Sequence, residues 1–269
     1  MKHAVSNIAL PAYRHEADLG RLQETGLQGL EVAPSRVWED TRSGLTAGEV
    51  SSYRRQIETA GLEVVGLHSL LFDQPELELF GSADSRNELL AFFVHLSAVC
   101  RDLGGKSLIW GGGRRRGEVA GEDAERRAID FFNLLAERID SHGTCYCIEP
   151  LGPTDTDFIH SVFDSKRIVD AVDRPSLKIQ IDAKALAAND ELILDPFIAA
   201  GADLVHYHAN EPGFEVLGAS GAVDHTAAGK YLREINYEGY VSIEQKLLDH
   251  DDPLASIRAS VTVLQEAYM

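Results

Sequence analysis

The chain is poor in cysteine and lacks long apolar runs. Cys100, Cys145 and Cys147 form an odd set without the spacing of a disulfide framework, which is typical of a reducing compartment. No apolar run approaches the ~20 residues that a membrane span requires. The N-terminal sequence MKHAVSNIALPAYRHE lacks the apolar stretch of a signal peptide. We therefore expect a cytoplasmic protein without a membrane partner.

Basic residues are also scarce, and nothing resembling a linker divides the chain. The net charge of −18 argues against a nucleic-acid partner, because phosphate binding requires a face rich in Lys and Arg. One dense basic cluster, Arg114 to Arg116, is large enough to hold a single anionic group. With no Pro/Ser tract or low-complexity stretch, 269 residues fit one domain, and we expect residues 1–269 to form it.

What the sequence does contain is a regular alternation of short apolar runs with amphipathic segments. The apolar runs, typical of buried strands, lie near 3–10, 27–33, 62–68, 105–110, 144–149, 177–182, 202–208 and 239–244. The helical patterns lie near 16–25, 46–60, 84–103, 121–141, 160–172, 189–200, 225–236 and 253–267. Thr46 followed by Glu49 is a capping box, and Ser82 or Asp84 can cap the third helix.

Eight strand–helix units in about 250 residues are typical of a TIM barrel, the (β/α)8 fold of the α/β class. A doubly wound open sheet is the competing fold, and it often carries a Gly-rich dinucleotide loop after its first strand. Here the first strand leads into LPAYRHEA, which has no GxGxxG pattern. The sequence therefore favours the barrel, in which the carboxyl ends of all strands meet on one face.

Each of the last four strand-like runs ends in a residue of a type that binds metal ions. They are Glu149 in CYCIEP, Asp182 in LKIQID, His208 in DLVHYH and Glu244 in YVSIEQ. Neighbouring barrel strands are ~5 Å apart, so four adjacent strand ends can surround one cation. Buried carboxylates are costly unless they are paired or bound to a metal. Three carboxylates and one imidazole favour Mn²⁺ or Mg²⁺, with Co²⁺ or Zn²⁺ as alternatives.

With these residues the sequence resembles the xylose isomerase-like superfamily, in particular its sugar phosphate isomerase/epimerase group. The local contexts that carry the resemblance are IEPLGP, IQIDAKAL, VHYHANEPG and YEGYVSIEQK, together with GLQGLEVAPSRVW, GLEVVGLHSLLF and KSLIWGGGRRRG. They cover nearly the whole chain. The resemblance is specific for the fold and the metal site and weak for the substrate. It also favours a homo-oligomer, since barrels of this group are often dimers or tetramers.

The resemblance implies an isomerase or epimerase that binds one divalent ion and a small sugar-like substrate. Glu149 and Glu244 would be the acid/base pair as well as metal ligands, and Asp182 and His208 would be ligands only. The chemistry is reasonable on first principles: a cation polarises a carbonyl and stabilises an enediolate, while one carboxylate removes the α proton and the other returns one.

Three positions depart from the epimerases of this group. A substrate-binding His three residues after the Asp is replaced by Ala185, and a Glu six residues after the first Glu is replaced by Asp155. An Arg six residues after the ligand His is replaced by Phe214. We therefore do not transfer 3-epimerase specificity to this chain, although Asp155 stays a candidate substrate-binding residue.

Other residues could supply the substrate contacts. Lys184 and Lys246 each lie two residues beyond a ligand, so in extended backbone their ammonium groups would turn toward the metal. Together with Arg114 they would suit an anionic sugar. His68 and Trp110, at the ends of strands 3 and 4, are expected to contact the substrate as well. Deeper in the barrel, we expect His206 and Glu31 to be structural or to support a ligand.

Three alternative functions stay open. A dehydratase of a keto-polyol would need the same metal and the same two acids, which expel a β-hydroxyl instead of returning a proton. Endonuclease IV shares the barrel, but Trp110 and Ala185 stand where two of its zinc-binding His residues would be expected. A non-catalytic sugar sensor would have less reason to retain all four ligands.

Overall fold

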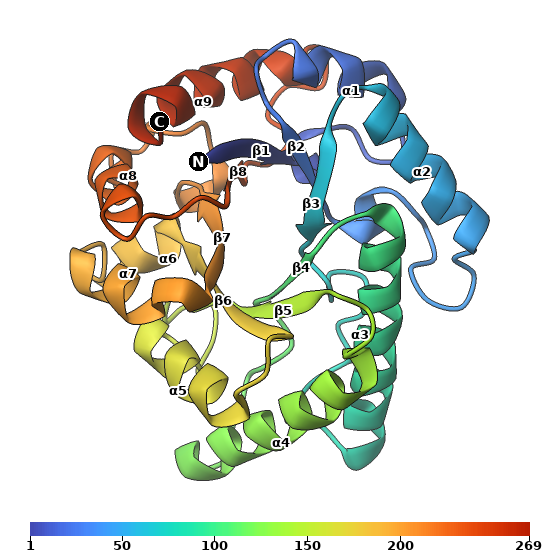
Figure 1. Ribbon diagram of the computed structural model, residues 1–269, viewed down its shortest axis with the longest axis vertical. Coiled ribbons are helices and arrows are strands. Elements are labelled where there is room, and N and C mark those ends of the chain that lie inside the picture. The colour runs from blue at the N-terminus through green and yellow to red at the C-terminus, as the bar shows by residue number, and fades with distance from the viewer.

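The strands close into a complete barrel. The computed structural model describes residues 1–269. Each strand pairs in parallel with the next along the chain, and the last pairs with the first (Figure 1). The strands are β1 (Lys2–Ser6), β2 (Gly29–Val32), β3 (Glu63–Leu67), β4 (Ser107–Trp110), β5 (Cys145–Ile148), β6 (Leu177–Asp182), β7 (Leu204–Ala209) and β8 (Tyr240–Ile243). The predicted TIM barrel is confirmed.

The helices form a ring around this barrel (Figure 1). They are α1 (Glu16–Gln23), α2 (Ala47–Thr59), α3 (Ala83–Leu103), α4 (Gly121–Ile139), α5 (Val162–Val172), α6 (Ala183–Ala188), α7 (Leu194–Ala200), α8 (His225–Glu234) and α9 (Pro253–Ala267). Short 3₁₀ helices are η1 (Asn7–Ala9), η2 (Pro34–Arg36), η3 (Gly201–Asp203) and η4 (Pro212–Phe214). No helix combines the length and the apolar character that a membrane span requires.

The predicted helix starts at α2 and α3 are confirmed. Thr46 accepts a hydrogen bond from the backbone N–H of Glu49, and the Glu49 carboxylate accepts one from the backbone of Thr46, which completes the capping box. The Ser82 side chain accepts from Ser85 at the start of α3. Such caps each stabilise a helix by about 1 kcal/mol because they satisfy otherwise unpaired N–H groups.

Two predicted elements are wrong in their bounds. The strand expected over 3–10 ends at Ser6, whose hydroxyl accepts from the N–H of Ile8 and starts η1. The helix expected near 189–200 begins only at Leu194, and an unexpected helix, α6, comes directly after β6. Asp182 starts α6, because its carboxylate accepts from the N–H of Ala185 at 2.7 Å.

Apolar side chains on the outer face of the strands pack against the helices. Tyr146 of β5 stacks on Phe93 of α3 with ring centroids 4.7 Å apart. Trp110 of β4 meets Phe132 of α4 edge to face at 5.0 Å. Side chains alternate along a strand, so Glu149, which follows Ile148, turns to the opposite face, into the barrel. The packing of the outer layer therefore fixes which side chains line the interior.

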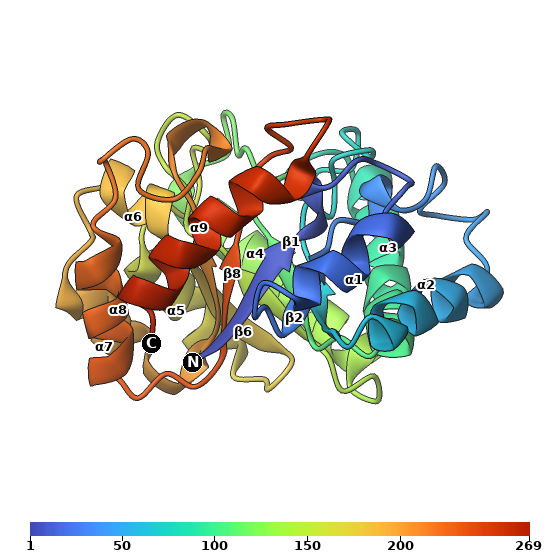
Figure 2. The same ribbon diagram turned by 90° about the horizontal axis from the view of Figure 1, so that it is seen from above.

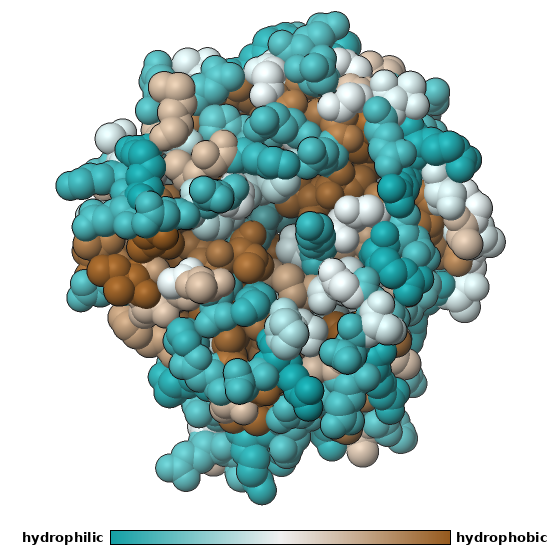
Figure 3. All heavy atoms as spheres, in the orientation of Figure 1, coloured by the Kyte–Doolittle hydropathy of each residue, from teal (hydrophilic) through white to brown (hydrophobic).

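The two ends of the barrel differ in what they carry. Both termini lie at the end where the strands begin, and the connections that follow the strands lie at the opposite end (Figure 2). Hydrophilic residues cover much of the end with the termini, with hydrophobic patches among them (Figure 3). The candidate site is at the other end, where the strands finish.

Candidate active site

The structure brings the four predicted ligands together at the carboxyl ends of β5 to β8. The Nδ1 atom of His208 lies 3.7 Å from a Glu149 oxygen, 4.0 Å from an Asp182 oxygen and 3.4 Å from a Glu244 oxygen. All four side chains are buried, with exposed fractions between 1% and 9%. The Nδ1 atom of His208 therefore lies within 4.0 Å of three carboxylates.

This donor set fits a divalent cation. Nδ1 of His208 is buried and has no hydrogen-bond partner. The candidate ligand atoms of Glu149, Asp182 and His208 all lie within 4.8 Å of one another. Donor atoms gathered this closely could serve as ligands of one shared cation. The cluster therefore forms a candidate metal site.

Electrostatics supports the same conclusion. Burial raises the pKa of Asp182 to about 7, and the neighbouring Glu149 and Glu244 carboxylates add to this rise. Burial also acts to raise the pKa of Glu244, but His208 and His68 outweigh it and lower that pKa below its usual range. Positive charge at this point thus stabilises the carboxylates, and a divalent cation would supply it.

Asn210 holds two of the carboxylates in place, and sequence reasoning missed it. Its fully buried side-chain amide donates to Asp182 at 2.6 Å and to Glu244 at 2.8 Å. Its side-chain oxygen accepts from the N–H of Lys184. Asn210 comes two residues after His208, just beyond the end of β7, so the alternation along the strand is a signal that could have identified it.

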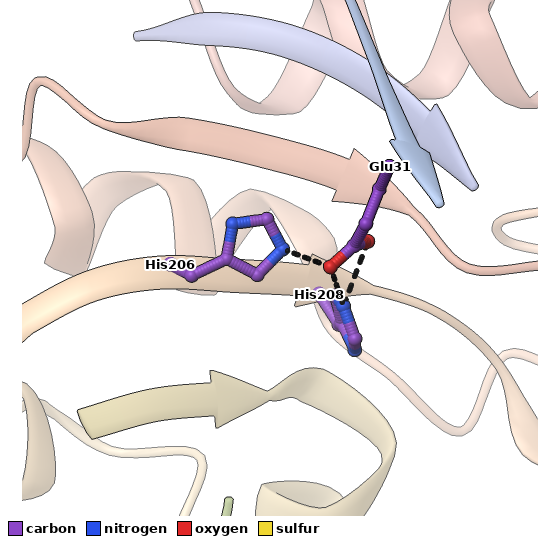
Figure 4. A group of neighbouring side chains, drawn as sticks. All are labelled: Glu31, His206 and His208. Carbon is purple, nitrogen blue, oxygen red and sulfur yellow. Dashed lines mark hydrogen bonds and ion pairs between the residues drawn. The ribbon is translucent and has the colours of Figure 1, made fainter. Parts of the chain in front are cut away.

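A second buried group, formed by Glu31, His206 and His208, shares His208 with the first (Figure 4). The Glu31 carboxylate lies 2.9 Å from Nε2 of His206 and 3.0 Å from Nε2 of His208, and it accepts from Ser242 at 2.9 Å. Burial raises the pKa of Glu31, but His206 and His208 outweigh it and hold that pKa well below its usual range.

The contact with Glu31 decides how His208 is protonated. Because the carboxylate accepts from Nε2, that nitrogen carries the proton, and Nδ1 would offer its lone pair to a cation bound among the other carboxylates. Glu31, His206 and His208 also lie close enough to hold an ion themselves. However, the Glu31 carboxylate already accepts from His208 and Ser242, so we interpret the group as a support for His208.

His68 completes the wall of the cluster. Its Nδ1 lies 3.4 Å from a Glu244 oxygen, and its Nε2 lies 2.5 Å from the hydroxyl of Ser6. Its ring meets that of His208 edge to face, with centroids 5.6 Å apart. His68 also lines the cavity above the carboxylates. A contact between His68 and substrate stays a prediction, with the side chain in a suitable place.

A cavity of about 440 Å³ opens above the cluster. Segments after β3, β4 and β5 form its walls, and Glu149, His208 and Glu244 form its floor. This size lies within the range of small-molecule sites. Gly111 lies beside the floor, where an added Cβ would come 2.0 Å from a Glu149 oxygen, so only glycine leaves room for that carboxylate.

The two predicted lysines lie in different surroundings. The ammonium of Lys184 lies 3.7 Å from Asp155 and 4.6 Å from the ring centroid of Phe214. Burial lowers the pKa of Lys184, but Asp182 and Asp155 outweigh it and raise that pKa. Lys246 is more exposed and pairs with Glu215 at 2.9 Å. Asp155 lines the cavity above the carboxylates. Lys184 and Asp155 thus form a polar pair at the edge of this cavity.

Arg114 is buried in the cavity wall and binds the main chain. Its guanidinium donates to the carbonyls of Trp110, Glu149 and Ile159 and lies 5.2 Å from the centre of the Trp110 ring. These bonds fix the backbone on which Glu149 is mounted. Burial lowers the pKa of Arg114 to about 10, which leaves it a cation at neutral pH. Substrate contacts of Arg114 and Trp110 stay predictions.

Comparison with known proteins agrees with this geometry. A family model described as xylose isomerase-like TIM barrel matches residues 19–267. A D-psicose 3-epimerase of Agrobacterium fabrum is 26% identical over 118 residues, 44% of this chain and 40% of that protein. A probable ketose 3-epimerase of Synechocystis sp. is 25% identical over 168 residues, 60% of this chain and 57% of that protein. The matches thus span between 40% and 57% of these relatives.

Solved structures show the same fold over the full chain. A D-psicose 3-epimerase with D-tagatose from Clostridium cellulolyticum H10 has a TM-score of 0.82 at 17% identity, covering 99% of this chain and 98% of that one. The E. coli 3-keto-D-glucoside 4-epimerase YcjR has a TM-score of 0.83 at 18% identity, covering 99% of each chain. The IOLI protein with a bound zinc atom has a TM-score of 0.78 at 17% identity, covering 100% of this chain and 98% of that one. Since the family model covers most of its length, the chain belongs to the xylose isomerase-like TIM barrel family.

Proposed function

We propose that the protein is a divalent-metal-dependent epimerase or isomerase of a keto-sugar, with Glu149 and Glu244 as its acid/base pair. One observation carries the proposal: three buried carboxylates and an unpaired imidazole nitrogen converge beneath a cavity of sugar size. The similarity to curated ketose 3-epimerases supports it. The excess of oxygen donors favours Mn²⁺ or Mg²⁺.

The residues divide the chemistry between them. When bound, the cation would polarise the substrate carbonyl and so acidify the neighbouring C–H. Glu149 and Glu244 come from β5 and β8, on either side of β6 and β7, so they can approach the reacting carbon from different directions. One removes the proton and the other delivers a proton to the opposite face. Asp182 and His208 would hold the cation, and Asn210 would fix Asp182 and Glu244 by donating to both carboxylates.

Isotope exchange tests this proposal. The Mn²⁺-loaded protein is incubated in D₂O with D-tagatose, D-allulose, D-fructose and a methyl 3-keto-β-D-glucoside, and deuterium next to the carbonyl is followed by NMR. We expect exchange and a new epimer with at least one sugar, and loss of both in Glu244→Gln. Absorbance of an α,β-unsaturated carbonyl would instead identify a dehydratase. Metal-loaded protein that exchanges no proton in any such sugar would refute the proposal.

We also propose that the protein is cytoplasmic. Cys100, Cys145 and Cys147 are all unpaired in the structure. Unpaired thiols are typical of a reducing compartment and so support the predicted cytoplasmic location.

A further inference from the structure

A second chamber adjoins the first at the catalytic floor. It has a volume of about 460 Å³ and is formed by segments after β1, β2, β3, β7 and β8, whereas the first chamber lies over the segments after β3, β4 and β5. Ser69, Phe72 and Glu244 line both chambers. Glu244 therefore lies at the junction, whereas Glu149 lines only the first chamber. The first chamber alone is large enough for a small sugar, so the second offers room for more.

The second chamber offers mainly apolar contacts. Ile8, Phe214 and Leu247 line it, and so does Phe72, whose side chain is 79% exposed. Phe72 is the most exposed large hydrophobic side chain of the protein and offers a contact for an apolar group. Each of these four residues comes from a different strand–helix connection.

Three basic side chains line the second chamber: Lys246 and Arg36 already have partners, and His250 is exposed. Lys246 pairs with Glu215 at 2.9 Å, and the Arg36 guanidinium donates to the carbonyl of Leu10 at 2.7 Å. The Glu244 carboxylate adds a negative charge at the junction. A phosphate or carboxylate in this chamber would compete with Glu215 for Lys246 and would meet the charge of Glu244, whereas an apolar group would do neither.

We propose that the substrate is a keto-sugar that carries an apolar substituent, such as an alkyl or aryl glycoside, with the sugar in the first chamber and the substituent in the second. The assignment rests on the proposed function for the position of the sugar, because Glu244 must reach the reacting carbon. The substituent then passes Glu244 and Phe72 and lies against Ile8, Phe214 and Leu247. This differs from the anionic substrate that Lys184, Lys246 and Arg114 suggest from the sequence.

A matched pair of ligands tests the assignment. Methyl and 4-nitrophenyl 3-keto-β-D-glucosides share the sugar and differ only in the substituent. Their binding to the Mn²⁺-loaded protein is measured by calorimetry, and deuterium exchange of both is followed in D₂O. Burial of the aryl ring predicts about tenfold tighter binding of the nitrophenyl compound.

Variants locate the effect. Leu247→Trp fills the chamber and is expected to remove the preference for the nitrophenyl compound, and Leu247→Asp is expected to do the same by making the wall polar. Leu248, the next residue, does not line the chamber, so Leu248→Trp is the matched control and is expected to keep the preference. Circular dichroism confirms that each variant is folded.

The outcomes separate this inference from the proposed function. Equal binding of the two glucosides, or a preference that Leu247→Trp and Leu247→Asp leave intact, would overturn the second chamber as the substituent site. Preferential binding of an acidic analogue, the glucuronide, over the nitrophenyl compound would overturn the apolar assignment. Absence of deuterium exchange with a retained preference for the nitrophenyl compound would refute the proposed activity while supporting the chamber's ligand class.

Discussion

Replacement of Glu31 by Gln is expected to weaken metal binding without any change to a metal ligand. The fully buried Glu31 carboxylate accepts from His208 and Ser242 and lies 2.9 Å from Nε2 of His206. Gln keeps the size of the side chain but turns one acceptor oxygen into an N–H donor. Glu31 accepts from both Nε2 of His208 and the hydroxyl of Ser242, so an N–H in place of one oxygen sets one of these contacts donor against donor.

The size of the effect follows from the loss of support for His208. Without a carboxylate at Nε2, the imidazole is less basic and can rotate or present the wrong tautomer. Loss of such a partner typically weakens metal binding 10- to 100-fold, which corresponds to about 1.4 to 2.8 kcal/mol. We therefore expect a Kd for Mn²⁺ that is higher by one to two orders of magnitude.

Calorimetric titration of metal-free protein with Mn²⁺ measures this directly. Glu63→Gln is the matched control, since Glu63 lies at the opposite end of the barrel and pairs with Lys2 at the surface. The control should bind Mn²⁺ like the wild type, and thermal melting shows that both variants are folded. An unchanged Kd in folded Glu31→Gln would refute the idea that Glu31 sets the state of His208.

Three further predictions follow from other parts of the molecule. Asn210→Leu removes the donor shared by Asp182 and Glu244, so calorimetry should show weaker Mn²⁺ binding; binding equal to wild type would contradict that role. Burial lowers the pKa of His15 from 6.5 to about 4, so the unfolded chain takes up a proton that the folded chain refuses as the pH falls below 6.5. Urea titrations should thus show the wild type losing about 2 to 3 kcal/mol more stability than His15→Asn between pH 7 and pH 4.5, and parallel losses would contradict this. Thr46→Ala should cost about 1 kcal/mol of unfolding free energy in urea, and no loss would show that the capping box contributes nothing.

The barrel and the meeting of four ligands could be predicted from the sequence because both depend on short-range patterns. Strand-like runs and helix caps recur along the chain. A residue at the carboxyl end of a barrel strand must lie on the face where all the strands end. Glu149, Asp182, His208 and Glu244 therefore needed only the order of the strands to be brought together. The helix α6 was missed because Asp182 serves both as a ligand candidate and as a helix cap.

What the sequence could not supply is the direction of long side chains in the loops. Lys246 was expected to turn to the metal, yet its flexible side chain pairs with Glu215 from another connection. Arg114 was expected at the substrate, yet its guanidinium binds carbonyls of β4, the end of β5 and the following loop. Such partners come from segments far apart in the chain, and spacing alone does not bring them together. The second chamber was missed for the same reason.

Metal stoichiometry tests the central claim most directly. Metal-free protein is titrated with Mn²⁺ by calorimetry beside a variant in which Asp182→Asn and His208→Gln are combined. We predict one Mn²⁺ ion per chain in the wild type and no measurable binding in the folded double variant. A wild type that takes up no ion, or a double variant that still binds one ion with the same affinity, would contradict the assignment of the barrel mouth as a metal site.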